Sequence, residues 1–188
     1  MDRLDFLRKF KTFDEWYEIV KDILNDEEFL KRKKFKHHGE VSVYEHCCLV
    51  SLKSYALAKK LHADSRTAAI AGLLHDFYPK AWVDSEELKE LDPEYSSQLN
   101  KKLPLWKMHG FVHAKEACLN YQKFYPNLVD KKVTNAIKRH MFPLNIVPPR
   151  YIESWIITIV DKECSTKDVI HIKGMPKKLV IWFIKLFK

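Results

Sequence analysis

Apolar residues recur at three- and four-residue spacings through most of this 188-residue chain, which places them on one face of an α-helix. Only 4 glycines are present, and runs that alternate strictly between apolar and polar residues are scarce. Hydrophobic residues make up 46% and charged residues 31% of the chain, a balance typical of a packed globular protein. The sequence therefore predicts a compact, all-α fold.

Helix-capping residues and prolines divide this pattern into five expected helices. They cover residues 42–61, 64–77, 111–124, 129–141 and 150–164. Residues 1–36 are expected to form a helical preamble. The polar stretch 80–104 holds two prolines, so we expect short helical pieces there, in an exposed excursion that can cover a site. We expect a single domain over residues 1–188, with its core at about 42–166.

The C-terminal stretch 176–188 combines apolar residues with four lysines and predicts an amphipathic helix. We expect this helix to dock onto the domain or a partner subunit; the alternative is that it lies on an anionic membrane. A spanning segment of about eighteen apolar residues and a signal-peptide core are both missing from the pattern, so we expect a cytoplasmic protein. The cysteines lack CxxC spacing and are interpreted as buried thiols: Cys47, Cys48, Cys118 and Cys164.

Histidine and aspartate residues lie beside apolar residues in four of the expected helices: His46, His75-Asp76, His140 and Asp161. A buried imidazole or carboxylate costs free energy unless it is hydrogen-bonded or bound to a cation. For any one histidine alone, a structural role is the simplest interpretation. As a set, helices can project these groups into one pocket, where imidazole and carboxylate together bind divalent metals.

This ordered set resembles the H…HD…D signature of HD-superfamily phosphohydrolases over about residues 42–166. The dipeptide His75-Asp76 stands in Gly72-Leu73-Leu74-His75-Asp76, and His109-Gly110 is similar to a further histidine of binuclear members. Their fuller pattern is H…HD…H…H…D. The resemblance implies a helical HD bundle with a metal site between its helices. The implied ligands, with Asp76 as the bridge between two ions, are His46, His75, Asp76, His109, His140 and Asp161.

The third histidine position is open between His109 and His113, which lie four residues apart on one helix face. We favour His109 as the ligand, and His113 is then expected to bind phosphate or to act as a catalytic acid. His38 is a candidate for the substrate pocket, with a loop or capping role as the alternative. Structural roles alone are expected for His37, His62 and His171.

Phosphate needs cationic side chains in addition to metal ions. Lys80 is similar to a basic residue of HD-type dinucleoside tetraphosphate hydrolases that contacts substrate, although Pro79 leaves its direction open. The stretch from Lys138 to Arg150 resembles a group of small bacterial proteins described as predicted HD hydrolases. The candidate substrate-binding residues, each with surface solvation or a loop role as the alternative, are His38, Lys80, Arg139, Arg150 and Lys162. The candidate catalytic residues are Asp76, Lys80 and His113.

Together these features predict a phosphohydrolase that cleaves a phosphate ester or anhydride, preferably of a nucleotide, with a metal-activated water. One or two divalent transition-metal ions are expected: iron, manganese, nickel, cobalt or zinc. Two alternatives stay open. One is a di-iron oxygenase, because oxygenase members of the superfamily use the same six ligands. The other is a non-catalytic regulatory protein that binds a nucleotide or a metal.

The formal net charge of +8 favours an anionic partner, but the basic residues are scattered and predict no specific nucleic-acid binding. The basic run 31–36 is interpreted as a solvated face or linker, with an anion-binding role as the alternative. The expected partner is a small phosphorylated substrate. Membrane association is not expected, and a homodimer is compatible with the sequence.

Overall fold

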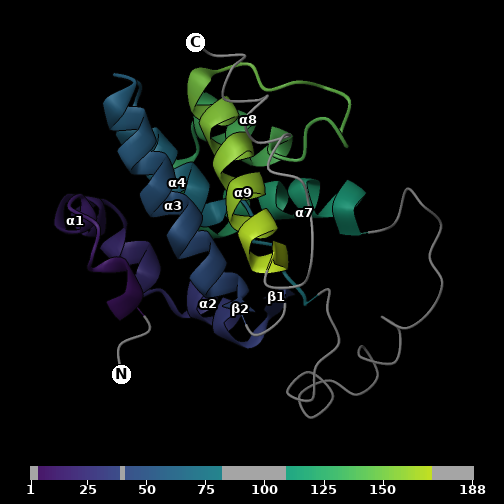
Figure 1. The fold of residues 1–188 in the computed structure, drawn as a ribbon. Coiled ribbons are helices and arrows are strands. Elements are labelled where there is room, and N and C mark those ends of the chain that lie inside the picture. The colour runs from purple at the N-terminus through teal and green to yellow at the C-terminus, as the bar shows by residue number, and fades with distance from the viewer. Residues whose placement is uncertain (1–3, 39–40, 82–108, 171–188) are drawn as a thin grey trace.

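The computed structural model describes residues 4–38, 41–81 and 109–170, which are helical except for one short hairpin and the connecting turns (Figure 1). The helices are α1 (Phe13–Leu24), α2 (Glu27–Leu30), α3 (Val43–Lys60), α4 (Ser65–Leu74), α7 (His109–Phe124), α8 (Lys131–Arg139) and α9 (Ile152–Ile170). The strands are β1 (Lys36–His38) and β2 (Val41–Ser42), and 3-10 turns cover Asp5–Leu7, Lys31–Lys34 and Pro126–Leu128.

The expected all-α fold is confirmed. The amphipathic helix expected at 176–188 and residues 82–104 of the excursion lie outside the described residues. Among the described segments, none of the helices has the length and apolar character needed to cross a membrane. The extent of the domain and the boundaries of its core stay predictions.

Side-chain caps begin the helices at the centre of the fold. Ser42 and Glu45 form a reciprocal capping box at α3, in which the Ser42 N–H donates to Glu45 Oε2 at 2.9 Å. The Asp64 carboxylate accepts the Thr67 N–H at 3.0 Å and begins α4, and the Asp130 carboxylate caps α8 in the same way. Because each cap satisfies N–H groups that lack a partner inside the helix, the helices begin close to where the sequence predicts.

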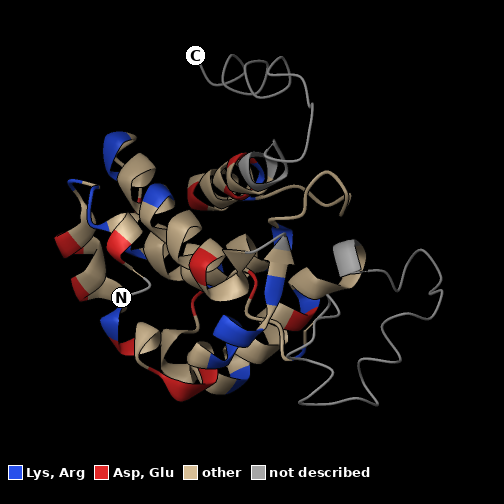
Figure 2. Ribbon diagram, turned by 60° about the horizontal axis from the view of Figure 1, so that its bottom comes forward, with Lys and Arg blue, Asp and Glu red and all other residues tan. Residues whose placement is uncertain are grey.

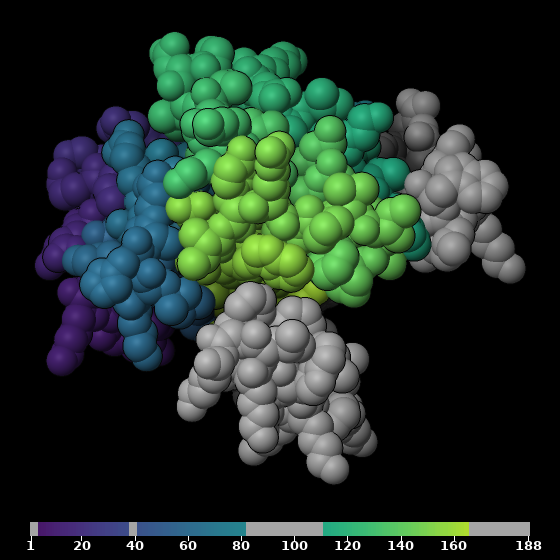
Figure 3. All heavy atoms as spheres, turned by 90° about the horizontal axis from the view of Figure 1, so that it is seen from above, coloured from purple at the N-terminus to yellow at the C-terminus, as the bar shows by residue number. Residues whose placement is uncertain are grey.

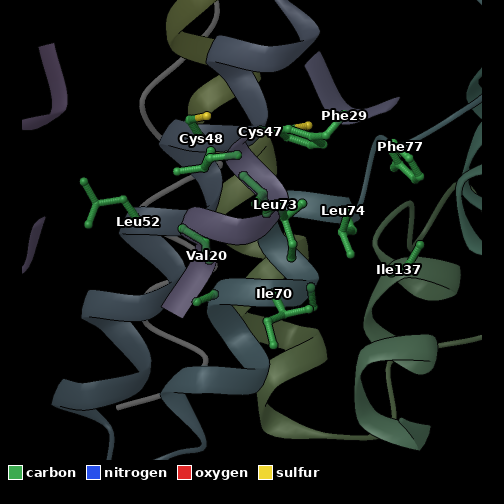
Figure 4. Close-up of a cluster of buried hydrophobic side chains, with 14 of the residues drawn as sticks. Val20, Phe29, Cys47, Cys48, Leu52, Ile70, Leu73, Leu74, Phe77 and Ile137 are labelled. Carbon is green, nitrogen blue, oxygen red and sulfur yellow. The ribbon is translucent and has the colours of Figure 1, made fainter. Parts of the chain in front are cut away.

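Helices α3, α4 and α9 pack against one another, and α8 contacts α4, α7 and α9. Viewed from above, α9 fills the space between the α3 side of the molecule and residues 109–140 (Figure 3). Val20 of α1, Leu52 of α3, Leu73 of α4 and Ile137 of α8 belong to one buried apolar cluster (Figure 4). The prediction of buried thiols is confirmed for Cys47, Cys48, Cys118 and Cys164.

A chain of buried hydrogen bonds ties α1 to the α3–α4 pair. The Trp16 indole Nε1 donates to Ser51 Oγ at 2.8 Å, and Ser51 Oγ donates to the Ala69 carbonyl oxygen at 2.6 Å. Both polar side chains are fully buried, so each must find a partner inside the protein. The preamble is therefore fixed to the core through a polar contact as well as through apolar packing.

Gly72 allows α3 and α4 to approach each other closely. A Cβ at this position would lie 2.8 Å from Ser51 Cα and 3.3 Å from Ile157 Cδ1. Backbone cannot move away as a flexible side chain can, so the contact requires glycine. The close pairing brings the first turn of α3 next to the end of α4, and the ring centroids of His46 and His75 lie 5.3 Å apart.

The hairpin of β1 and β2 was not predicted from the sequence. Lys36 pairs with Ser42 and His38 pairs with Val41, in antiparallel register. Strands of three and two residues are too short to show the alternation by which a strand is recognised. The hairpin leads directly into α3, and this connection carries His37 to the first turn of that helix.

Arg32, within the basic run 31–36, is fully buried, so the expectation of a solvated face is wrong for this residue. Its guanidinium carbon lies 4.3 Å from the centroid of the Phe77 ring, and Nη1 donates to the Glu28 carbonyl oxygen at 2.9 Å. Burial lowers the pKa of Arg32, and the nearby Glu28 carboxylate opposes this change. The side chain joins the preamble to the segment that directly follows His75-Asp76.

We expect Gly72→Ala to lower the free energy of unfolding by about 1–3 kcal/mol, because the added methyl group overpacks the contact with the Ser51 backbone. In an unhindered helix the same change raises stability by about 0.5–1 kcal/mol, so the sign is diagnostic. Urea unfolding followed by circular dichroism measures it. Arg66→Ala, at an exposed position of α4, is the control, and a stabilised Gly72→Ala protein would contradict the close packing.

Candidate metal centre

Five histidines and two aspartates from separate elements converge in the interior, and all seven side chains are buried. Elements far apart in the sequence deliver them. They are His37 on β1, His46 on α3, His75 and Asp76 at the end of α4, His113 on α7, His140 at the end of α8, and Asp161 on α9. The structure thus brings together five of the six ligands that the resemblance implies, and adds His113 and His37.

Two of these imidazoles are oriented by backbone carbonyls at helix ends. His75 Nδ1 donates to the Gly72 carbonyl oxygen at 2.8 Å, and His140 Nδ1 donates to the Ile137 carbonyl oxygen at 2.7 Å. A carbonyl can only accept, so Nδ1 carries a proton in both rings. In the neutral ring, Nε2 then has its lone pair free to face the cluster, which is the arrangement that metal-binding histidines use.

The first group of ligand atoms comes from α3, α4 and α9. His46 Nε2 lies 3.1 Å from Asp161 Oδ1, and His75 Nε2 lies 3.5 Å from the same oxygen. These three ligand atoms all lie within 4.8 Å of one another. The capping box at Ser42 and the glycine contact at Gly72 position this group, because they fix the start of α3 against the end of α4.

The second group contains Asp76, His113 and His140. Asp76 Oδ1 lies 3.4 Å from His113 Nε2 and 3.6 Å from His140 Nε2, and the two ring nitrogens are 2.9 Å apart. The other oxygen, Asp76 Oδ2, lies 3.6 Å from His75 Nε2 and 3.7 Å from His37 Nδ1. The two oxygens of Asp76 therefore face different sets of histidines, as a bridging carboxylate does.

The electrostatics of the cluster keep its carboxylates ionised. Burial by itself raises the pKa of Asp76, but the surrounding histidines, His75 first, hold it well below its usual range. The pKa of Asp161 is lowered against the effect of burial by its hydrogen bond with His46 and by the neighbouring His75. Burial and neighbouring imidazoles lower the pKa of His140 to about 3, so this ring is neutral. Ionised carboxylates beside neutral imidazole are the protonation states that bind cations.

The buried carboxylates change the pKa of His75. Burial lowers the pKa of His75, but Asp76 and further neighbours that include Cys47 and Asp161 outweigh it and raise the pKa well above the ordinary value. The cluster therefore draws positive charge to its centre. In the protein interior that charge can be a proton on His75 or a metal ion beside it.

The donor atoms are better arranged for metal binding than for hydrogen bonds among themselves. His75 Nε2 and Asp76 Oδ1 are buried and make no hydrogen bond within the described part of the chain. A buried polar atom without a partner costs about 1–3 kcal/mol, so such atoms point to a ligand. Atoms bonded to one ion at about 2.0–2.2 Å lie about 3–3.6 Å from each other, close to the separations found here. The described cluster can therefore hold a divalent metal.

The predicted cationic residues lie around this cluster at different depths. Lys162 is partly buried, and its Nζ donates to the His140 carbonyl oxygen at 2.9 Å; burial lowers its pKa, although Asp161 opposes this. Lys80 and Arg150 are exposed and Arg139 is partly exposed. Lys162 therefore contacts a candidate ligand residue directly, through the backbone carbonyl of His140 at the end of α8.

Two predicted residues cannot be placed, because the side chains of His109 and His38 lie outside the described residues. His37, for which the sequence indicated a structural role only, lies in the cluster. The register of the hairpin shifts between Lys36 and His38, so simple strand alternation does not predict from the sequence which side chain turns toward α3. The signal in the sequence was the adjacent pair of histidines ahead of His46, but the choice between them depends on the register of the hairpin.

The HD domain family model matches residues 43–165, which is more than half of the chain. No curated protein matches the chain. Among solved structures, the crystal structure of a predicted HD superfamily hydrolase from an uncultured Thermotogales bacterium is similar at 14% sequence identity. The alignment covers 100% of this chain and 97% of that chain, with a TM-score of 0.41. The family match contains His46, His75-Asp76 and Asp161, the signature set of the resemblance. The chain therefore belongs to the HD domain family.

Proposed function

We propose that this protein is a metal-dependent hydrolase that cleaves a phosphate ester or anhydride, with nucleotides as the preferred substrate class. The observation that carries the proposal is the pair of buried triads, one of His46, His75 and Asp161 and one of Asp76, His113 and His140. Membership of the HD family supports the same general chemistry. When bound, divalent ions polarise a phosphoryl oxygen and lower the pKa of a bound water, as phosphate hydrolysis requires.

The residues of the chain have distinct roles in this proposal. Asp76 supplies one oxygen to each set of histidines, so it sets the spacing between the two halves of the site. The carbonyl contacts of His75 and His140 hold both rings in the orientation that presents Nε2. His113 touches Asp76 and His140, and we assign it to the ion-binding set, with His109 as the competing ligand.

Phosphate recognition is assigned to cations near the triads. Lys162 already donates to the His140 carbonyl, so its main role is to support that ligand. Lys80 is exposed and follows Asp76 by four residues, which makes it the candidate for contact with a phosphate group. Basic and acidic residues are interspersed over the described ribbon (Figure 2), which supports a small anionic substrate over a nucleic acid.

We expect Asp76→Ala to abolish both metal binding and hydrolysis, because the variant removes the carboxylate shared by the two histidine sets. Metal content by mass spectrometry, on protein purified without chelator, and a screen of nucleotides and simple phosphomonoesters with added manganese, nickel or cobalt measure the two effects. Asp22→Asn, at an exposed position of α1, is the matched control. A wild-type protein that stays metal-free and inactive after reconstitution would contradict the proposed function.

The competing histidines of α7 can be separated by single substitutions. If His113 is the ligand, His113→Ala loses metal affinity by at least about tenfold, whereas His109→Ala binds metal as the wild type does. Isothermal titration with Mn²⁺ or Co²⁺ measures both affinities. The reverse result would assign the ligand to His109. It would leave His113 as the candidate acid, to be tested by whether His113→Ala lowers kcat with full metal content.

We expect Lys80→Met to raise KM for a phosphorylated substrate by about tenfold at unchanged metal content, because one charge-assisted hydrogen bond contributes about 1.4 kcal/mol. Steady-state kinetics with metal-loaded enzyme test this. Lys60→Met, at the exposed end of α3, controls for the general loss of positive charge. An unchanged KM would contradict this role and would indicate that Lys80 is only a solvated surface residue.

A further inference from the structure

His37 lies against the first triad although it belongs to none of the motifs from which the site was predicted. Its ring stacks on His46 with centroids 3.8 Å apart and an interplanar angle of 24°, and its side chain is 9% exposed. His37 Nδ1 lies 3.7 Å from Asp76 Oδ2. The ring is thus in contact with one residue of the first triad and with the carboxylate that joins the two triads.

The positions of the donor atoms indicate that His37 can act as a metal ligand. Ligand atoms of His37, His46 and Asp76 all lie within 4.8 Å of one another, so they form a third triad. The triad that contains His75 and the triad that contains His113 share no residue, whereas the third shares His46 with one and Asp76 with the other. His37 therefore stands where it can reach an ion held on the His46 side of Asp76.

His37 and His46 offer imidazole nitrogens beside the carboxylate of Asp76, and imidazole with carboxylate binds divalent transition metals. The separation of 3.7 Å from Asp76 Oδ2 is longer than a hydrogen bond. It is close to the separation of two atoms that share one ion.

Resting on the function proposed above, we propose that His37 is an additional protein ligand of the ion held by His46, His75 and Asp161. With Asp76 as the bridge, this position has three imidazoles and two carboxylates. The other position has Asp76, His113 and His140 among the described residues. A position rich in protein ligands is closed, whereas one with three keeps places for water and phosphate. The hairpin would thereby make the two positions unequal, and the residues beside His113 would leave more room for substrate.

A second consequence concerns the metal. A position with three imidazoles favours iron, cobalt, nickel or zinc over magnesium, because imidazole suits the softer transition metals and carboxylate suits the harder ions. His37 would therefore contribute to metal selectivity at the closed position. The hairpin of β1 and β2, which lies outside the region that the family model matches, would then have a role in metal binding.

The test is a titration of the metal-free protein with Co²⁺, followed by calorimetry and by visible absorption, which reports the number and type of ligands. The variants are His37→Ala and His37→Phe. Phenylalanine retains a flat ring that can stack on His46 but has no ligand nitrogen. His62→Asn, which removes an exposed histidine far from the cluster in sequence, is the control. Thermal unfolding of each metal-free variant checks that it is folded.

We expect His37→Phe and His37→Ala to weaken one Co²⁺ binding step by at least about tenfold and to change its absorption spectrum, with the His62→Asn protein unchanged. If His37→Ala does not fold, the result with His37→Phe alone decides whether His37 is a ligand. Affinity and spectrum retained in His37→Phe would overturn the assignment, because stacking alone would then explain the position of the ring. A wild-type protein that binds no Co²⁺ would overturn the proposed function as well, so the two failures are distinguishable.

Discussion

Two carboxylates buried among five imidazoles are the constraint on which the rest of this structure depends. An ionised Asp76 or Asp161 loses its hydration in the core, and the protein has to replace it with hydrogen bonds and positive charge. Histidines on every side lower the pKa of both carboxyl groups, and the same carboxylates raise the pKa of His75. The fold therefore encloses a place where positive charge is stabilised, and in the HD family setting a metal ion is the charge that fits.

The helices hold these histidines and aspartates in defined positions. His75 and His140 stand at helix ends, where backbone carbonyls without a helical partner orient their imidazoles. The Gly72 contact fixes α3 against α4, and α9 packs against both and brings Asp161 into the cluster. A helix bundle of this kind can gather ligands from distant parts of the chain while apolar packing around them limits access of water.

Elements outside the helical core also contribute to the site. The preamble contains Arg32, whose guanidinium packs on Phe77 directly after the His75-Asp76 pair. The hairpin that follows carries His37 to His46. These contacts bring Arg32 and His37 into the surroundings of the candidate metal centre, and both residues lie outside the region that the family model matches.

Helix caps and the candidate ligands were predictable from the sequence to the extent that they depend on local pattern. Apolar periodicity and capping residues such as Ser42 and Asp64 predicted the helices, because a helix is stabilised mainly by residues near one another in the chain. The order of His46, His75-Asp76 and Asp161, each beside apolar residues, pointed to one buried site.

The tertiary structure decided which neighbouring side chains enter that site. The hairpin, whose register shifts between Lys36 and His38, places the ring of His37 on His46, and the local sequence does not reveal this register. On α7, His109 and His113 lie four residues apart, and the packing of that helix brings His113 to Asp76. Likewise, the basic run does not reveal that Arg32 is buried, because burial depends on residues that meet it from elsewhere in the chain. The sequence by itself determined the helices and the ligand types, and the three-dimensional packing decided which histidines surround Asp76.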